Sequence, residues 1–203
     1  MIGVRLRSRA PRAHCIPNNP FHLRIPQPDT ADMALTQQLA RVSEAYLAQC
    51  RRHAAASADG DPEWNPPDED VLDLDWAVWG LLRYCRETDV ACEWTAAVQR
   101  SIEGENADSV RFLDHPEVYD GFGTPPALLA PPVVAEVARR LDAIDMDSLL
   151  RLLPSDAASA AAVCGFGAFH GDLRKYLEDH VAALTDFYRG AARRGMAVVE
   201  WVD

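Results

Sequence analysis

The side chains with the clearest potential for chemistry are His180 and two aspartates, Asp73 and Asp75. His180 falls near the middle of an apolar helical stripe, where an imidazole needs a hydrogen-bond partner, and Asp75 or Asp73 is the natural carboxylate. The pair is either a buried structural contact, which we favour, or a general base held by an acid in a cleft. In the second interpretation the walls of the cleft are aromatic: Trp76, Trp79 and Tyr188.

Established catalytic and cofactor motifs are absent from the sequence. It contains no Gly-x-Ser-x-Gly elbow, no HExxH, no Walker loop and no Cys/His pair at ligand spacing. We therefore expect no assignable catalytic residue, cofactor or metal. The cysteines are odd in number and never form a CxxC pair, which predicts reduced thiols that pack as small hydrophobic side chains. They are Cys15, Cys50, Cys85, Cys92 and Cys164.

The acidic loop at residues 57–69, SADGDPEWNPPDE, imitates a calcium-binding loop in part. Asp59, Asp61, Glu63 and Asn65 stand at alternate positions, as oxygen ligands of calcium do. However, Trp64 occupies the position of the required glycine, and prolines break both flanks. We therefore expect no calcium site in this loop.

Charge divides the chain into two unlike parts. Residues 1–32 carry five arginines against Asp29 and Asp32, a net charge of +3, whereas residues 33–203 carry fifteen cations against twenty-nine acids, a net charge of −14. So acidic a domain is a poor binder of nucleic acid, whose phosphates need a positive surface. The charge is compatible with a basic protein partner, although solubility alone is the simpler explanation. No apolar run reaches the roughly eighteen residues that indicate a membrane span.

The first 32 residues do not resemble the rest of the chain. They contain five prolines and show no helical or alternating period. They also lack the continuous apolar core of a signal peptide. We interpret them as a disordered leader or an over-extended start, and we place a single domain at residues 33–203.

The first half of that domain predicts a strand and two helices. Residues 35–42 alternate loosely and end at Ser43, which can cap a helix from Glu44 to about His53. Residues 70–87 are apolar nearly all round, which predicts a buried central helix. One of the two aspartates within it, at 73 or 75, should then point into the structure and need a partner.

The second half predicts mainly helices and a final strand. We expect one or two helices at 93–110, a loop at 114–126, a helix opened by Pro131, a short helix at 147–153 and a weak helix or loop at 156–171. A long amphipathic helix then begins after Asp172 and stops at Gly195, followed by a strand at 196–202. The fold class is therefore α+β: a predominantly helical single domain with a small sheet that joins strands 35–42 and 196–202.

This order of elements resembles the YfbM-like family of small bacterial proteins, a domain of unknown function. The segments that carry the resemblance are LDLDWAVWGLL, ALLAPPVVAEVARRLDAIDMDSLL and YLEDHVAALTDFYRGAARRGMAVVEWVD. The resemblance covers residues 33–203. It implies an α+β fold in which the first strand lies near the last, and a cytoplasmic protein without an assigned activity. The chain departs from the family pattern at Ala130, where a polar helix cap is usual, and in its longer acidic loop.

Two functions from different classes are compatible with these observations. We favour a non-catalytic cytoplasmic binding protein, for example an acidic immunity- or antitoxin-like partner that covers a basic surface on another protein. The alternative is a small hydrolase or ligand-binding protein that uses His180 with Asp75 or Asp73. An open pocket that reaches His180 would favour the alternative.

Overall fold

The computed structural model describes residues 36–90, 92–105, 107–119, 121, 124–167 and 169–203. All of them belong to one structural unit, Ala34–Asp203. The leader predicted at 1–32 and the start of the first predicted strand lie outside the described residues. None of the helices in the described part of the chain is both long enough and apolar enough to cross a bilayer.

A four-stranded antiparallel sheet lies at the centre of this unit, in the order β2-β1-β4-β3. Its central pair is β1 (Gln37–Val42) with β4 (Ala197–Val202), and the edges are β2 (Val71–Asp73) and β3 (Ala127–Leu129). Beyond the pair, Thr36 and Asp203 exchange both backbone hydrogen bonds, at 2.6 and 3.0 Å. The prediction that the first and last strands share a sheet is confirmed, as is the α+β class.

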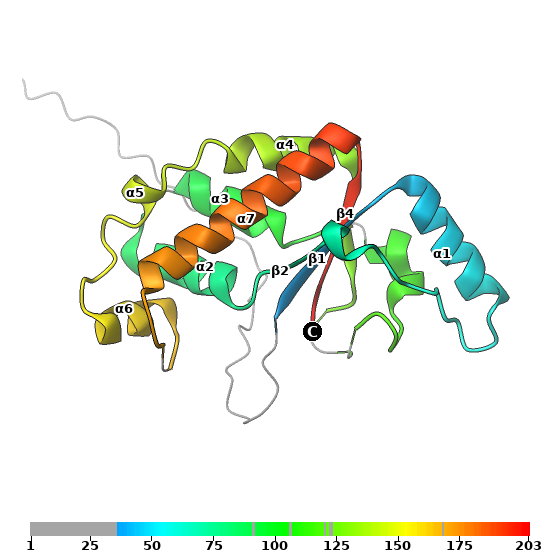
Figure 1. Cartoon of the computed structure of the whole chain (residues 1–203), viewed down its shortest axis with the longest axis horizontal. Helices are drawn as coiled ribbons and strands as arrows, with labels where there is room; N and C mark the ends of the chain where they lie inside the picture. The colour runs from blue at the N-terminus through cyan, green and yellow to red at the C-terminus, as the bar shows by residue number, and fades with distance from the viewer. Residues whose placement is uncertain (1–35, 91, 106, 120, 122–123, 168) are drawn as a thin grey trace, which may run out of the picture. The chain divides into compact units, whose positions relative to one another are not determined.

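One face of the sheet is covered by a layer of helices (Figure 1). Leu39, Leu129 and Val198 of the sheet belong to the same hydrophobic cluster as the apolar sides of these helices. The layer consists of α2 (Ala77–Thr88), α3 (Cys92–Ser101), α4 (Pro131–Leu141) and α7 (Leu173–Arg194), with the shorter α5 (Met146–Leu149) and α6 (Ala157–Cys164) beside them.

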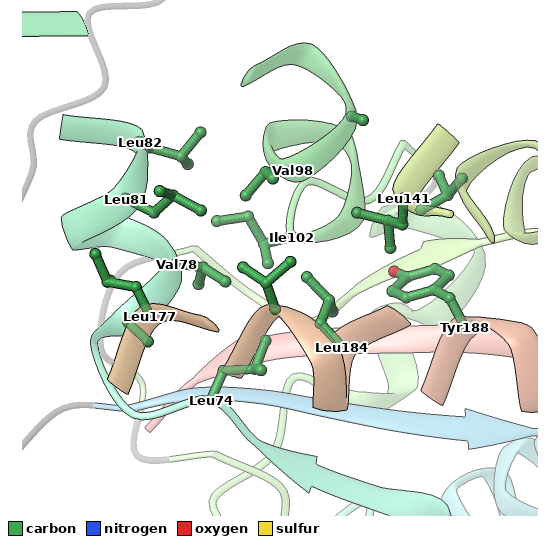
Figure 2. Close-up of a cluster of buried hydrophobic side chains, with 14 of the residues drawn as sticks. Leu74, Val78, Leu81, Leu82, Val98, Ile102, Leu141, Leu177, Leu184 and Tyr188 are labelled. Carbon is green, nitrogen blue, oxygen red and sulfur yellow. The ribbon is translucent and has the colours of Figure 1, made fainter. Parts of the chain in front are cut away.

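The longest helix, α7, supplies the centre of this core. Figure 2 shows Leu177 and Leu184 of α7 among Val78 of α2 and Ile102, which follows α3. Tyr188 lies in the same cluster, where its hydroxyl donates a 2.6 Å hydrogen bond to the carbonyl oxygen of Ser101. Burial of this apolar stripe against three other helices is the main reason that α7 is stable.

The opposite face of the sheet packs against α1 (Glu44–Ala56) and a 3-10 helix, η2 (Ala107–Leu113). Ala40 and Val42 of β1 and Val199 and Trp201 of β4 contribute to this second cluster. Alternate residues of both central strands therefore serve two different cores, as the two-residue period of a strand requires. In Figure 1, α1 lies on the side of the strands away from α7.

Several local predictions are confirmed. The Ser43 hydroxyl accepts from the Tyr46 amide at 3.1 Å and begins α1. The Asp172 carboxylate accepts from the Lys175 amide at 3.1 Å and begins α7, which ends at Gly195 with φ 62°. The helix α4 begins at Pro131 although Ala130 offers no side-chain cap.

The predicted helix at 70–87 is wrong in its first part. Residues 68–70 form a short 3-10 turn, η1, residues 71–73 form β2, and the helix begins only at Ala77. The Asp73 side chain accepts from the Asp75 amide at 2.7 Å, and Asp75 adopts a left-handed φ of 49°. An aspartate that bonds to the backbone two residues on favours a turn over a helix, so the apolar run is divided there.

The inward carboxylate predicted at Asp73 or Asp75 is instead Asp70. Asp73 and Asp75 are exposed, whereas 5% of Asp70 is exposed. Asp70 accepts from Arg41 Nε of β1 at 2.7 Å and from two guanidinium nitrogens of Arg194 at the end of α7. The buried charge thus has the partners that burial demands.

Candidate functional site

The predicted pair of His180 with an aspartate does not form. Asp75 accepts a 2.9 Å hydrogen bond from the hydroxyl of Tyr176, and His180 Nδ1 lies 2.7 Å from the backbone carbonyl oxygen of Tyr176. His180 is half-buried, so the predicted full burial is wrong. A histidine held by its own helix backbone has no acid to orient it as a general base.

Tyr176 is the residue that organises this region. Its ring lies 4.3 Å from the His180 ring and 5.0 Å from the Phe169 ring, centroid to centroid. Burial raises the pKa of the Tyr176 hydroxyl well above its ordinary value, and the Asp75 carboxylate raises it further. The hydroxyl therefore stays protonated and acts as a hydrogen-bond donor, a structural role.

Among the described ring contacts, neither predicted tryptophan stacks on His180. Trp76 and Trp79 pack edge to face on each other, with centroids 6.0 Å apart. The Trp79 indole nitrogen is buried without a partner in the described part of the chain. Tyr188 is fully buried in the core and lies eight residues from His180, about 12 Å along the helix axis.

A surface hollow lies instead on the other side of the sheet, between α1 and the acidic loop that follows it. Its volume is about 450 Å³. Two aromatic rings and three carboxylates line it, together with two amide side chains. The lining residues are Tyr46, Gln49, Asp61, Glu63, Trp64, Asn65 and Glu117.

The aromatic wall of the hollow is fixed from behind. The rings of Tyr46 and Trp64 meet at 62° with centroids 5.5 Å apart, and Trp64 packs edge to face on Trp201 of β4. The Tyr46 hydroxyl accepts from the Asn65 amide at 2.8 Å. Burial raises the pKa of Tyr46 to about 12, so its ring carries no charge at neutral pH.

The carboxylates of the hollow are fixed by the loop itself. Asp61 accepts from the Glu63 amide at 2.7 Å, and Glu63 adopts a left-handed φ of 52°. Glu63 also pairs with Nδ1 of His53 on α1 at 2.6 Å. The loop is therefore hydrogen-bonded to α1 through the Tyr46 hydroxyl, and the Glu63 carboxylate lies next to His53 of α1. No three histidine, cysteine, aspartate or glutamate side chains gather as a metal site within the described ranges.

The hollow lies within a region whose acids have no lysine or arginine partner in the described part of the chain. We define the acidic region as residues 43–69 and 107–119, which carry nine carboxylates against three arginines. No lysine or arginine in the described part of the chain forms a salt bridge with any of the nine. By contrast, eight acids elsewhere pair with arginine or lysine: Asp70, Glu105, Glu136, Asp142, Asp147, Glu178, Asp179 and Asp186.

Sequence reasoning missed a buried polar cluster on the central strands. Glu200 of β4 accepts from Gln37 Nε2 of β1 at 3.1 Å and from the Gly104 amide at 3.3 Å. Burial raises the pKa of Glu200 to about 7, although both hydrogen bonds act to lower it. The oxygen of the Gln37 amide is buried without a partner among the described residues. Within AVVEWV no pattern marks this carboxyl, because alternation places it on a buried face like its apolar neighbours.

A known protein family matches almost the whole described chain. A domain of unknown function, DUF1877, matches residues 33–201. The chain belongs to the DUF1877 family. The DUF1877 match includes the acidic region, the hollow and Glu200 alike. Comparisons with curated proteins and with solved structures found no match.

Proposed function

We propose that this protein is a non-catalytic binding protein whose acidic region covers a basic surface on a protein partner. An immunity- or antitoxin-like role, in which the partner is kept inactive, is the form of this function that we favour. We further propose that the chain is a YfbM-like member of DUF1877 and acts in the cytoplasm. The observation that carries the proposal is the set of nine carboxylates without a lysine or arginine partner in the described part of the chain.

The distribution of charge supports binding over simple solubility. Acids that serve only solubility need not be concentrated in one region of the surface. Here Arg140, Arg174 and Arg189 of the helical layer pair with neighbouring acids, whereas the acidic region holds nine carboxylates against three arginines, none of which forms a salt bridge with them in the described part of the chain. An uncompensated field of one sign accelerates encounter with a partner of the opposite sign and repels nucleic acid.

The enzyme alternative, a hydrolase that uses His180 with Asp75 or Asp73, has less support. Asp75 is engaged by Tyr176, and Asp73 accepts from the Asp75 amide. The hollow described above is not lined by His180. Among the described residues, His180 therefore lacks the acid partner that this alternative needs.

Affinity capture with matched variants tests the proposal. The full chain is immobilised, exposed to lysate of the source cells, and compared with Glu44→Gln/Asp108→Asn, which removes two acids of the region outside the hollow. The control, Glu87→Gln/Glu93→Gln, removes two exposed acids of α2 and α3. Glu44 and Glu93 both lie in the first turn of a helix, so the two variants are closely matched.

We expect a basic protein to be retained by the wild type and the control and to be lost with the acidic-region variant. Its retention should also weaken with added salt, since the attraction is electrostatic. Equal retention by both variants, or no enrichment of a basic protein, would contradict the proposal.

A further inference from the structure

The geometry of the hollow points to one kind of occupant. We infer that it binds a single arginine side chain of the partner, which stacks its guanidinium on the Tyr46–Trp64 wall and bonds to the carboxylates of Asp61, Glu63 and Glu117. This inference rests on the proposed function, because it names the anchor by which the partner is held.

The lining has the two features that a guanidinium recognises. Aromatic faces attract cations, and a planar guanidinium can stack on them. Carboxylates accept its paired N–H groups in parallel, which a compact ammonium cannot match. Asp61 is half-buried, whereas Glu63 and Glu117 are exposed, so Asp61 is the least exposed carboxylate of the hollow.

No cation of the described chain already fills the hollow. Arg51, on the same helix as Tyr46, donates to the carbonyl oxygen of Ser109 at 2.8 Å and lies over the Phe112 ring at 5.1 Å. Arg41 lies over the Phe187 ring at the same distance. Arg51 thus contacts both an aromatic ring and an oxygen acceptor within the protein. The hollow presents the same two kinds of group, aromatic rings and oxygen acceptors, to the solvent.

The wall is built before any partner arrives. The Tyr46–Asn65 hydrogen bond and the Trp64–Trp201 contact hold it without a ligand. Binding to such a site loses little conformational entropy. The volume of about 450 Å³ suits one long side chain entering from solvent rather than an enclosed ligand.

Titration with small arginine analogues tests the inference on the full-length protein. The probes are N-acetyl-arginine methylamide, its lysine counterpart, and the citrulline counterpart, which keeps the shape of arginine without the charge. Chemical shifts are followed by NMR, with the Trp64 indole signal assigned from a Trp64→Phe variant. We expect the arginine probe to shift the Trp64 indole and the amides around Glu63 and Glu117. The lysine probe should bind several-fold more weakly, and the citrulline probe should have no effect.

Variants then separate the hollow from the general field. Asp61→Asn/Glu117→Gln should weaken arginine binding about tenfold, whereas Glu87→Gln/Glu93→Gln should leave it unchanged. Asn at 61 keeps the oxygen that accepts from the Glu63 amide, and unchanged signals elsewhere report that the variant is folded. Equal shifts with citrulline, or shifts away from Trp64, would overturn the inference.

The two proposals fail differently. If the partner is captured through the acidic region but the arginine probe does not reach Trp64, the inference is wrong and the proposed function stands. If the probe binds in the hollow but no basic protein is captured, the proposed function is wrong and the inference survives as an arginine site.

Discussion

At the scale of single residues, the protonation of Glu200 is sensitive to pH near neutrality. Its carboxyl is 8% exposed on β4, between donors from Gln37 and Gly104. The nearby Glu103 adds repulsion that raises its pKa further. Tyr188 of α7 also lies near Glu200, and Arg100 at the end of α3 lies near Tyr188.

Replacing Glu200 by glutamine should remove a pH dependence of stability. The pKa of Glu200 rises from its ordinary value of 4.5 to about 7, so this group's contribution is complete below about pH 4.5 and is lost as the pH rises through 7. Between about pH 5 and pH 8, the unfolding free energy of the wild type should fall by about 2.5 kcal/mol more than that of Glu200→Gln. Urea unfolding of both proteins at pH 5 and pH 8 measures this difference. If the unfolding free energy changes equally with pH in both proteins, Glu200 is already ionised in the folded state at acid pH.

His180→Ala should cost less than about 1 kcal/mol of stability, because a half-buried ring bonded to its own helix backbone leaves no distant partner unsatisfied. A fully buried histidine with a distant partner would lose more stability on the same substitution, about 2–4 kcal/mol. Leu184→Ala on the same stripe, fully buried, should cost about 2–5 kcal/mol and serves as the comparison. A loss at His180 comparable to that at Leu184 would restore the core role.

At the scale of elements, the contact of the segment after α3 with β3 depends on Gly104. A Cβ on Gly104 would lie 2.6 Å from the Ala127 Cβ and 2.7 Å from the Leu128 nitrogen. Backbone of β3 cannot yield as a side chain does, so Gly104→Ala should destabilise the protein by about 1–3 kcal/mol. Gly167→Ala, where no atom lies within 4 Å, is the control and should be near neutral in the same denaturation experiment.

The ion cluster at Asp70 ties three elements together: β1 through Arg41, η1 and the end of α7 through Arg194. Asp70→Ala should lower the unfolding free energy by about 2–4 kcal/mol, since it leaves the half-buried Arg41 without its carboxylate. The hydrogen bonds from Arg194 lower the pKa of Asp70, so the stabilisation is present at neutral pH and is lost only as the solution becomes strongly acid. The unfolding free energies of the wild type and Asp70→Ala should therefore approach each other in strong acid. A difference that stays constant with pH would argue against the ionic explanation.

Elements could be predicted from the sequence where one local signal decided them. The caps at Ser43 and Asp172, the stop at Gly195 and the proline at 131 each act within one turn of a helix. The strand β2 could not be predicted, because its three residues are held by pairing with β1 rather than by their own pattern.

The candidate site shows the same limit more strongly. The composition of the acidic loop suggested ligands, but the hollow depends on Trp201 and Glu117, which reach it from 137 and 53 positions beyond Trp64 in the chain. Likewise, Asp70 and Glu200 are defined by partners in distant segments. Tertiary contacts of this kind leave no local periodicity in a single sequence.

At the scale of the whole molecule, the acidic region should reduce stability, as binding surfaces often do. Like charges without counter-charges repel, and salt screens that repulsion. Asp61→Asn/Glu117→Gln should therefore be at least as stable as the wild type at low ionic strength. Added sodium chloride should reduce the difference in melting temperature between the two proteins. Thermal melting in a salt series measures both; a destabilised variant would mean that these acids support the fold.

The pairing of β1 with β4 also constrains the order of events in synthesis. Gln37 bonds to the carbonyl oxygen of Trp201, 164 positions away, and every other described element lies between the two strands. While the nascent chain grows, β1 can pair with β2 on one side only, and its other edge stays open until β4 has left the ribosome. Contacts this distant close slowly, and open strand edges favour aggregation. We therefore expect the sheet to be completed only after β4 has been synthesised, and the edge of the first strand to be prone to aggregation until then.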